Sequence, residues 1–176
     1  MKIAGDIRWL GSGPRLGLGE LEIPPVQPGS SIMPGKVNPV IAESLIMACA
    51  QVIGNDASIA LGGLYSHLEL NTMLPLIARN LLESINLLAN ASVMFRVKLV
   101  DGLKVNRKRI ESQNERSLSL ATPLAPLIGY DKAAEIAKKA YREGKTIRQV
   151  AMEDKILPKK VLDLALNLFK QTKPGE

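Results

Sequence analysis

A serine pair, a lysine and an asparagine stand close together in residues 29–39, which read Gly-Ser-Ser-Ile-Met-Pro-Gly-Lys-Val-Asn-Pro. The hydroxyl groups of Ser30 and Ser31 can donate or accept a hydrogen bond, and the Lys36 ammonium is a cation. Asn38 followed by proline is typical of a helix start, with asparagine as the cap. Because a helix N-terminus also attracts negative charge, the segment predicts an anion-binding loop.

Known phosphate-binding motifs do not describe this segment. A Walker A loop requires four residues between its glycines and a hydroxyl residue after the lysine. Here five residues separate Gly29 from Gly35, and Val37 follows Lys36.

Further along, Glu43 lies in an otherwise apolar helical run, where an unpaired carboxylate would be unfavourable. We therefore expect Glu43 to have a partner.

The composition excludes several classes of site. The chain of 176 residues has one Cys, Cys49, and one His, His67. A single cysteine excludes a disulfide framework and a Cys-rich zinc site, and a single histidine excludes any site that needs two imidazoles within the chain. The chain has few aromatic residues, so we do not expect a stacking platform for single-stranded nucleic acid. We find no secretory signal, and no apolar run long enough to span a bilayer is expected. These features predict a cytoplasmic protein without a membrane partner.

Hydrophobic periodicity predicts an all-α fold. A helix end is expected at residues 2–10, a loop at 11–35, and long helices from Asn38 to about Ile53 and from Met73 to about Val100. Shorter amphipathic helices are expected at 107–117, 131–143, 146–153 and 158–169. The long helices are apolar over much of their surface, which indicates a bundle completed by other chains or segments.

The charge distribution divides the chain in two. Residues 1–103 carry seven basic and eight acidic side chains, whereas residues 104–176 carry sixteen basic and nine acidic ones. We therefore predict that residues 1–103 form part of a central helical bundle and that residues 104–176 form a small basic helical C-terminal domain. Interleaved acidic residues favour a solvated, ion-paired surface in the basic part over a nucleic-acid site.

Residues 29–39 resemble the signature of the aspartase/fumarase superfamily, and we call them the signature loop. The similarity is continuous from about residue 2 to residue 157 and includes the motifs Asp6–Leu10, Ser12–Arg15, Gly54–Asp56, Leu68–Asn71 and Ile128–Ala134. Class II fumarate hydratases resemble this chain in having glycine, here Gly35, before the lysine. Aspartases usually have alanine at that position. Gly5 stands where these fumarases usually have asparagine. The chain thus resembles the C-terminal portion of a class II fumarate hydratase.

The resemblance implies a role for each residue of the signature loop. It implies reversible hydration of fumarate to (S)-malate with Ser30 as the catalytic base, without a metal or organic cofactor. Ser31, Lys36, the backbone of Val37 and Asn38 would hold the dicarboxylate substrate. A base that removes the weakly acidic C3 proton of malate needs nearby positive charge, which Lys36 and the loop N–H groups can supply.

One further residue, Glu43, corresponds to the family carboxylate that orients a histidine. That histidine is not in this chain, because His67 lies outside the matching motif. Family active sites combine segments from three subunits of a homotetramer. The resemblance therefore implies a fragment that contributes one segment of the site and is inactive alone.

Two other functions stay open at this point. A related lyase, chiefly aspartate ammonia-lyase, would share the signature loop. A non-catalytic helical assembly or a basic nucleic-acid-binding module would explain the helices and the positive charge without any reaction.

Overall fold

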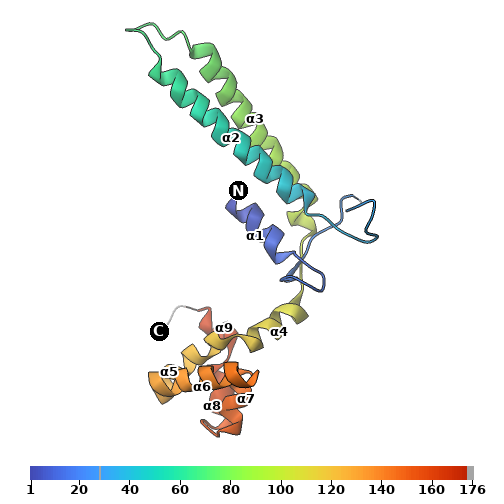
Figure 1. The fold of residues 1–176 in the computed structure, drawn as a ribbon, viewed down its shortest axis with the longest axis vertical. Coiled ribbons are helices and arrows are strands. Elements are labelled where there is room, and N and C mark those ends of the chain that lie inside the picture. The colour runs from blue at the N-terminus through green and yellow to red at the C-terminus, as the bar shows by residue number, and fades with distance from the viewer. Residues whose placement is uncertain (28, 174–176) are drawn as a thin grey trace. The chain divides into compact units, whose positions relative to one another are not determined.

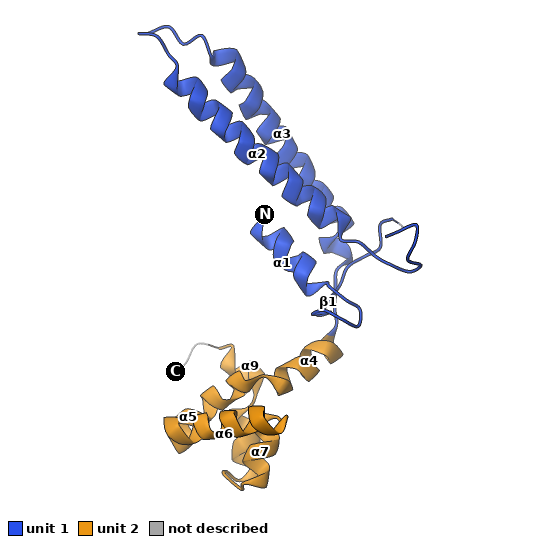
Figure 2. Cartoon of the chain, viewed as in Figure 1, with its two compact units in different colours: residues 1–106 blue, residues 107–176 orange. Residues whose placement is uncertain are grey.

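A computed structural model describes residues 1–27 and 29–173, so that the last three residues of the expected C-terminal domain lie outside the described part. The chain divides into two compact units, residues 1–106 and residues 107–176 (Figures 1 and 2). The described residues are mostly helical, which confirms the all-α prediction.

Unit 1 consists of one short and two long helices with a small antiparallel strand pair. Its elements are α1 Lys2–Leu10, β1 Leu21–Glu22, α2 Val40–Leu64, α3 Leu74–Lys98, the 3₁₀ turn η1 Val100–Gly102 and β2 Lys104–Val105. In the strand pair, Leu21 lies opposite Val105 and Glu22 opposite Lys104. Strands of two residues are too short for an alternating pattern, so the sequence did not indicate them.

A long hairpin of α2 and α3 dominates unit 1 (Figure 1). The prediction that α2 runs to about Ile53 was too short, because the helix continues to Leu64 through glycines that usually lower helix propensity. Gly62 is buried against α3, and a Cβ there would lie 2.9 Å from a side-chain carbon of Ile77. Close packing against α3 therefore explains why this glycine is tolerated.

A hydrogen-bonded polar cluster lies between the two helices. Asn55 and Ser84 are its buried members, and the Asn55 amide donates to the Ser84 hydroxyl over 3.2 Å. The Gln51 side-chain amide donates to the side-chain Oδ1 of Asn55 over 2.9 Å, and the Ser84 hydroxyl donates to the backbone oxygen of Asn80 over 2.7 Å. Because each polar group has a partner, the cluster is accommodated within an apolar hairpin.

Helix α2 is also long and apolar enough to span a membrane by length and composition, with a mean hydropathy of 1.4. The expectation that no segment reaches this length is therefore wrong, because the helix is longer than the sequence pattern indicated. However, α2 carries Glu43 and Asp56 and packs along α3. Only 11% of the apolar window is buried within the chain, so most of its surface lacks a covering element here.

The short helix α1 packs against the N-terminal half of α2 in antiparallel orientation. Met1 lies close to Cys49, whereas Arg8 lies close to Glu43. Ala4 of α1 and Ala42 of α2 are almost completely buried, together with two apolar residues that follow along the chain, Phe95 and Leu99. Small alanine side chains let the two helices approach closely, which fixes α1 beside the start of α2.

Unit 2 is a small helical domain with its own core. Its elements are α4 Arg107–Arg116, the 3₁₀ helix η2 Leu118–Leu124, α5 Ala125–Ile128, α6 Tyr130–Glu143, α7 Ile147–Glu153, α8 Lys159–Ala165 and α9 Leu168–Gln171. The predicted helix at 158–169 is divided into α8 and α9, because Asn167 caps a new helix by accepting from the backbone of Lys170. The core includes Leu124, Ile147, Val150 and Leu162, each completely buried.

Ion pairs cover the surface of unit 2. Arg148 contacts Glu115 over 3.1 Å and also pairs with Asp163, while Lys139 pairs with Asp154 over 2.6 Å. The hydrogen bond from Arg148 to Glu115 raises the pKa of the arginine. Several of the basic side chains thus already have carboxylate partners within the unit.

Candidate functional site

The signature loop joins β1 to α2 and is held in shape by a close backbone contact. A Cβ added at Gly29 would lie only 1.9 Å from the carbonyl oxygen of Lys36, so only glycine fits at this position. The side-chain amide of Asn38 donates to the carbonyl oxygen of Gly29. These two features bring the beginning and the end of the loop together.

Asn38 therefore closes the loop and does not cap the helix. The expectation of a cap was wrong because α2 begins at Val40, with Pro39 in the N-cap position and no side-chain cap bond. The Asn38 amide group donates back across the loop instead. The residue stays next to the helix start, but its side chain orders the loop.

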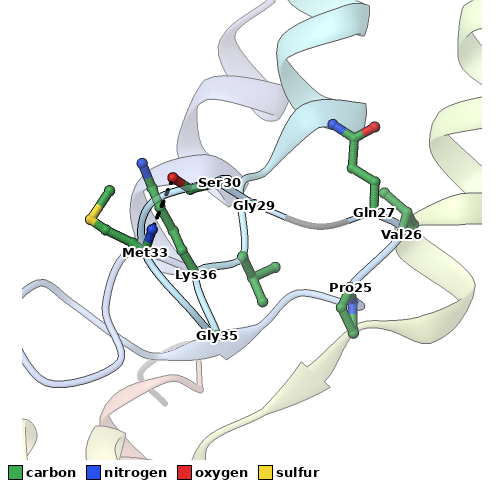
Figure 3. A pocket seen from close by; sticks show the side chains of 9 residues that line it. Pro25, Val26, Gln27, Gly29, Ser30, Met33, Gly35 and Lys36 are labelled. Carbon is green, nitrogen blue, oxygen red and sulfur yellow. Dashed lines mark hydrogen bonds between the residues drawn. The ribbon is translucent and has the colours of Figure 1, made fainter.

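The Ser30 hydroxyl oxygen accepts hydrogen bonds from two backbone N–H groups. The Ile32 nitrogen lies 3.1 Å from Oγ. The Met33 nitrogen lies 3.2 Å from it, and Figure 3 shows this second bond as a dashed line. Both bonds deliver partial positive charge to the oxygen. Since a charged acceptor forms stronger hydrogen bonds than a neutral one, these two N–H groups would stabilise negative charge that develops on the Ser30 oxygen.

A surface pocket of about 450 Å³ opens beside Ser30. In Figure 3 the side chains of Ser30 and Lys36 extend to the same side of this pocket. Val37 also lines it, whereas Ser31 and Asn38 do not. The structure thus brings together three of the residues predicted to act on an anion, ties Asn38 to their loop, and leaves Ser31 exposed outside the pocket.

Glu43 has a partner that the sequence did not identify. The guanidinium of Arg8 lies 3.0 Å from Oε1 of Glu43, and both side chains are partly exposed. Arg8 belongs to the motif Asp6–Leu10. It lies 35 residues before Glu43 in the sequence, so local spacing did not indicate that the two side chains are paired. The fact that Arg8 lies at the end of one helix and Glu43 at the start of another was the available indication.

His67 and Cys49 lie apart from the signature loop. His67 is in the turn between α2 and α3, and α2, which separates this turn from the loop, is about 37 Å long at about 1.5 Å per residue. Among the residues that the structure describes, no group of three or more His, Cys, Asp or Glu side chains is placed to hold a metal ion. The polar side chains that line the pocket are the hydroxyl of Ser30, the ammonium of Lys36 and the carboxamide of Gln27.

Comparison with protein families matches both units. Residues 1–54 match the family described as "Lyase", and residues 120–173 match the family described as "Fumarase C C-terminus". The class II fumarate hydratase 2 of Pseudomonas aeruginosa is 54% identical over 175 residues, which cover 99% of this chain and 38% of the relative.

Solved structures give the same match at the level of the fold. A protein from Brucella melitensis described as fumarate lyase:delta crystallin, bound to cobalt, has a TM-score of 0.92 and 48% identity over 98% of this chain and 37% of its own. The class II fumarase of Schistosoma mansoni has a TM-score of 0.92 and 39% identity, covering 99% of this chain and 36% of its own. The chain thus spans little more than a third of the length of these relatives.

Proposed function

Because the chain belongs to the class II fumarate hydratase family and corresponds to its C-terminal portion, we propose that it supplies the base-bearing segment of a fumarate hydratase active site. The reaction is the reversible hydration of fumarate to (S)-malate. The observation that carries the proposal is the Ser30 oxygen, which accepts two backbone N–H groups at a pocket that Lys36 also lines.

In the proposed mechanism, Ser30 removes the C3 proton of malate. The electron pair moves into the neighbouring carboxylate, which then carries two negative charges. Lys36, the Val37 backbone N–H and Asn38 hold that carboxylate, and Ser31 lies beside them. The C2–O bond then breaks, and the hydroxyl leaves as water by taking a proton from a histidine of another segment, which Glu43 orients. Stabilisation of the doubly charged group is the largest requirement, because the C3 proton is weakly acidic.

The proposal treats the chain as one part of a larger assembly. The pocket is open and no imidazole other than that of His67 is available in the chain. We expect the 176-residue chain by itself to hydrate fumarate at no measurable rate. Turnover by this chain alone at a rate typical of enzymes would contradict the need for other segments.

A chimeric protein provides the test. In this chimera the upstream part of the Pseudomonas aeruginosa relative is followed by this chain in place of the relative's own matching portion. We expect it to convert fumarate to (S)-malate, measured by proton NMR. A chimera that is folded by circular dichroism but does not hydrate fumarate, or that adds ammonia in place of water, would overturn the proposal.

We also propose that the chain forms part of a homotetramer through α2 and α3. Both helices expose large apolar side chains: Met47, Leu61, Leu64, Leu82, Ile85 and Val93 are each between 55% and 75% exposed. An apolar surface of this length is unusual for a monomer.

We also propose that the protein acts in the cytoplasm, where a free cysteine such as that of this chain stays reduced.

Replacing Ile85 with lysine should weaken this association. Ile85 is 56% exposed on α3, so the substitution leaves the core of the hairpin intact but places a charge in the proposed interface. Size-exclusion chromatography with light scattering on the chimera should show a shift from tetramer towards smaller species. Leu164→Lys, at a residue 58% exposed on α8, is the matched control and should leave the mass unchanged. Equal effects of both variants would contradict the assignment.

A further inference from the structure

Arg8 and Glu43 form an ion pair between the ends of two different helices. Arg8 lies in the last turn of α1, and Glu43 lies in the first turn of α2. The guanidinium Nη2 is 3.0 Å from Oε1 of the carboxylate. A helix C-terminus favours a cation and a helix N-terminus favours an anion, so each charge is also stabilised by its own helix.

The backbone on both sides of this ion pair belongs to a packed contact between two helices. Ala4 lies one turn before Arg8 and is 1% exposed, and Ala42 immediately precedes Glu43 and is fully buried. Ile7 packs against the same apolar cluster. The ion pair is therefore attached to a close-packed helix contact, so its geometry does not depend on a flexible loop.

Only one oxygen of Glu43 takes part in the contact. Oε1 faces Arg8, and among residues 1–27 and 29–173 no second side chain is hydrogen-bonded or ion-paired to this carboxylate. A carboxylate has four acceptor positions, so Oε2 can accept from an imidazole N–H while Oε1 stays with the arginine. Without Arg8, the three rotatable bonds of the glutamate side chain would leave its carboxylate in several positions.

We propose that Arg8 is a positioning residue for the hydration reaction: its guanidinium holds Oε1 of Glu43 so that Oε2 is presented to an imidazole from another segment. This inference rests on the proposed function, because the imidazole lies outside the chain. Arginine is suited to the task, since its guanidinium keeps its positive charge at every working pH. Arg8 acts only through Glu43 and contacts no substrate.

A double-mutant cycle in the chimera tests the proposal. Arg8→Gln should lower kcat by about tenfold, less than the roughly 10²-fold loss expected when a catalytic group is displaced by about 1 Å, and KM should stay unchanged. In the Glu43→Gln background, Arg8→Gln should have no further effect on kcat, because the carboxylate that it positions is gone. Arg8→Lys should restore part of the rate.

The control separates positioning from a general effect of charge or folding. Lys2→Gln removes another cation from α1, whose partner is Asp6 on the same helix, and should leave kcat unchanged. If Arg8→Gln lowers kcat by the same factor with and without Glu43, or raises KM, or if Glu43→Gln has no effect, the positioning role is wrong. An inactive but folded chimera with the unmodified chain would instead overturn the proposed function on which the inference depends.

Discussion

Replacing Ser30 with alanine lowers kcat for fumarate hydration by the chimera at least about 10²-fold, the lower range for losing a catalytic acid or base. The physical reason is that no other group at the pocket can take the C3 proton. The Lys36 ammonium is a cation and has no free electron pair in that form. Steady-state kinetics of fumarate hydration and malate dehydration give the measurement, and both directions should be slowed equally.

The neighbouring serine provides the matched control for this prediction. Ser31 is exposed and does not line the pocket, and its proposed role is confined to holding substrate. Ser31→Ala should therefore raise KM more than it lowers kcat. The assignment of the base would be reversed if Ser31→Ala caused the larger loss in kcat, and it would fail if neither variant differed from the unmodified chimera.

The helical fold could be predicted from the sequence because its longest elements have strong local signals. Apolar spacing of three and four residues indicated α3, and the structure places that helix at Leu74–Lys98. The extent of α2 beyond Ile53 could not be predicted, because the tolerance of Gly62 depends on its contact with Ile77 in another helix. The division near Leu166 similarly depends on a local cap that interrupts an otherwise continuous periodic pattern.

The candidate site was predictable where its residues are close in sequence and not where they are distant. Ser30, Lys36 and Val37 lie within eight residues, so a single loop brings them to one pocket. Sequence reasoning could not show that Asn38 donates to Gly29 instead of capping the helix, because both roles use the same side-chain amide group. The roles of these residues in catalysis stay predictions, which the kinetic experiments test.

Arg8 shows the limit of local reasoning. A requirement for a partner at Glu43 followed from the cost of leaving a charge unpaired in an apolar helix. The identity of that partner depends on how α1 packs on α2. This packing includes the buried Ala4 and Ala42, which have no distinctive pattern in the sequence. Residues that act from another element therefore need the structure to be found.

Gly29→Ala is expected to reduce kcat/KM by about 10²-fold, the loss that follows a displacement of catalytic groups by about 1 Å. The added Cβ would lie 1.9 Å from the Lys36 carbonyl oxygen and 2.4 Å from its carbonyl carbon. Both are backbone atoms, so rotation of a side chain cannot relieve the overlap and the two ends of the signature loop must separate. The separation would move Ser30 away from Lys36 and weaken the bond from Asn38 to Gly29.

Gly5→Ala is the matched control for the loop glycine, because nothing lies within 4 Å of a Cβ added there. Gly5 is in the interior of α1, where alanine favours the helix by roughly 0.5–1 kcal/mol, so this variant should retain activity and unfold at a slightly higher urea concentration. Circular dichroism should show both variants folded, since Gly29 lies outside the helices and the buried clusters. Normal kcat/KM in a folded Gly29→Ala chimera would mean that the loop adopts another conformation in the active protein, and that the close contact between Gly29 and Lys36 does not position Ser30.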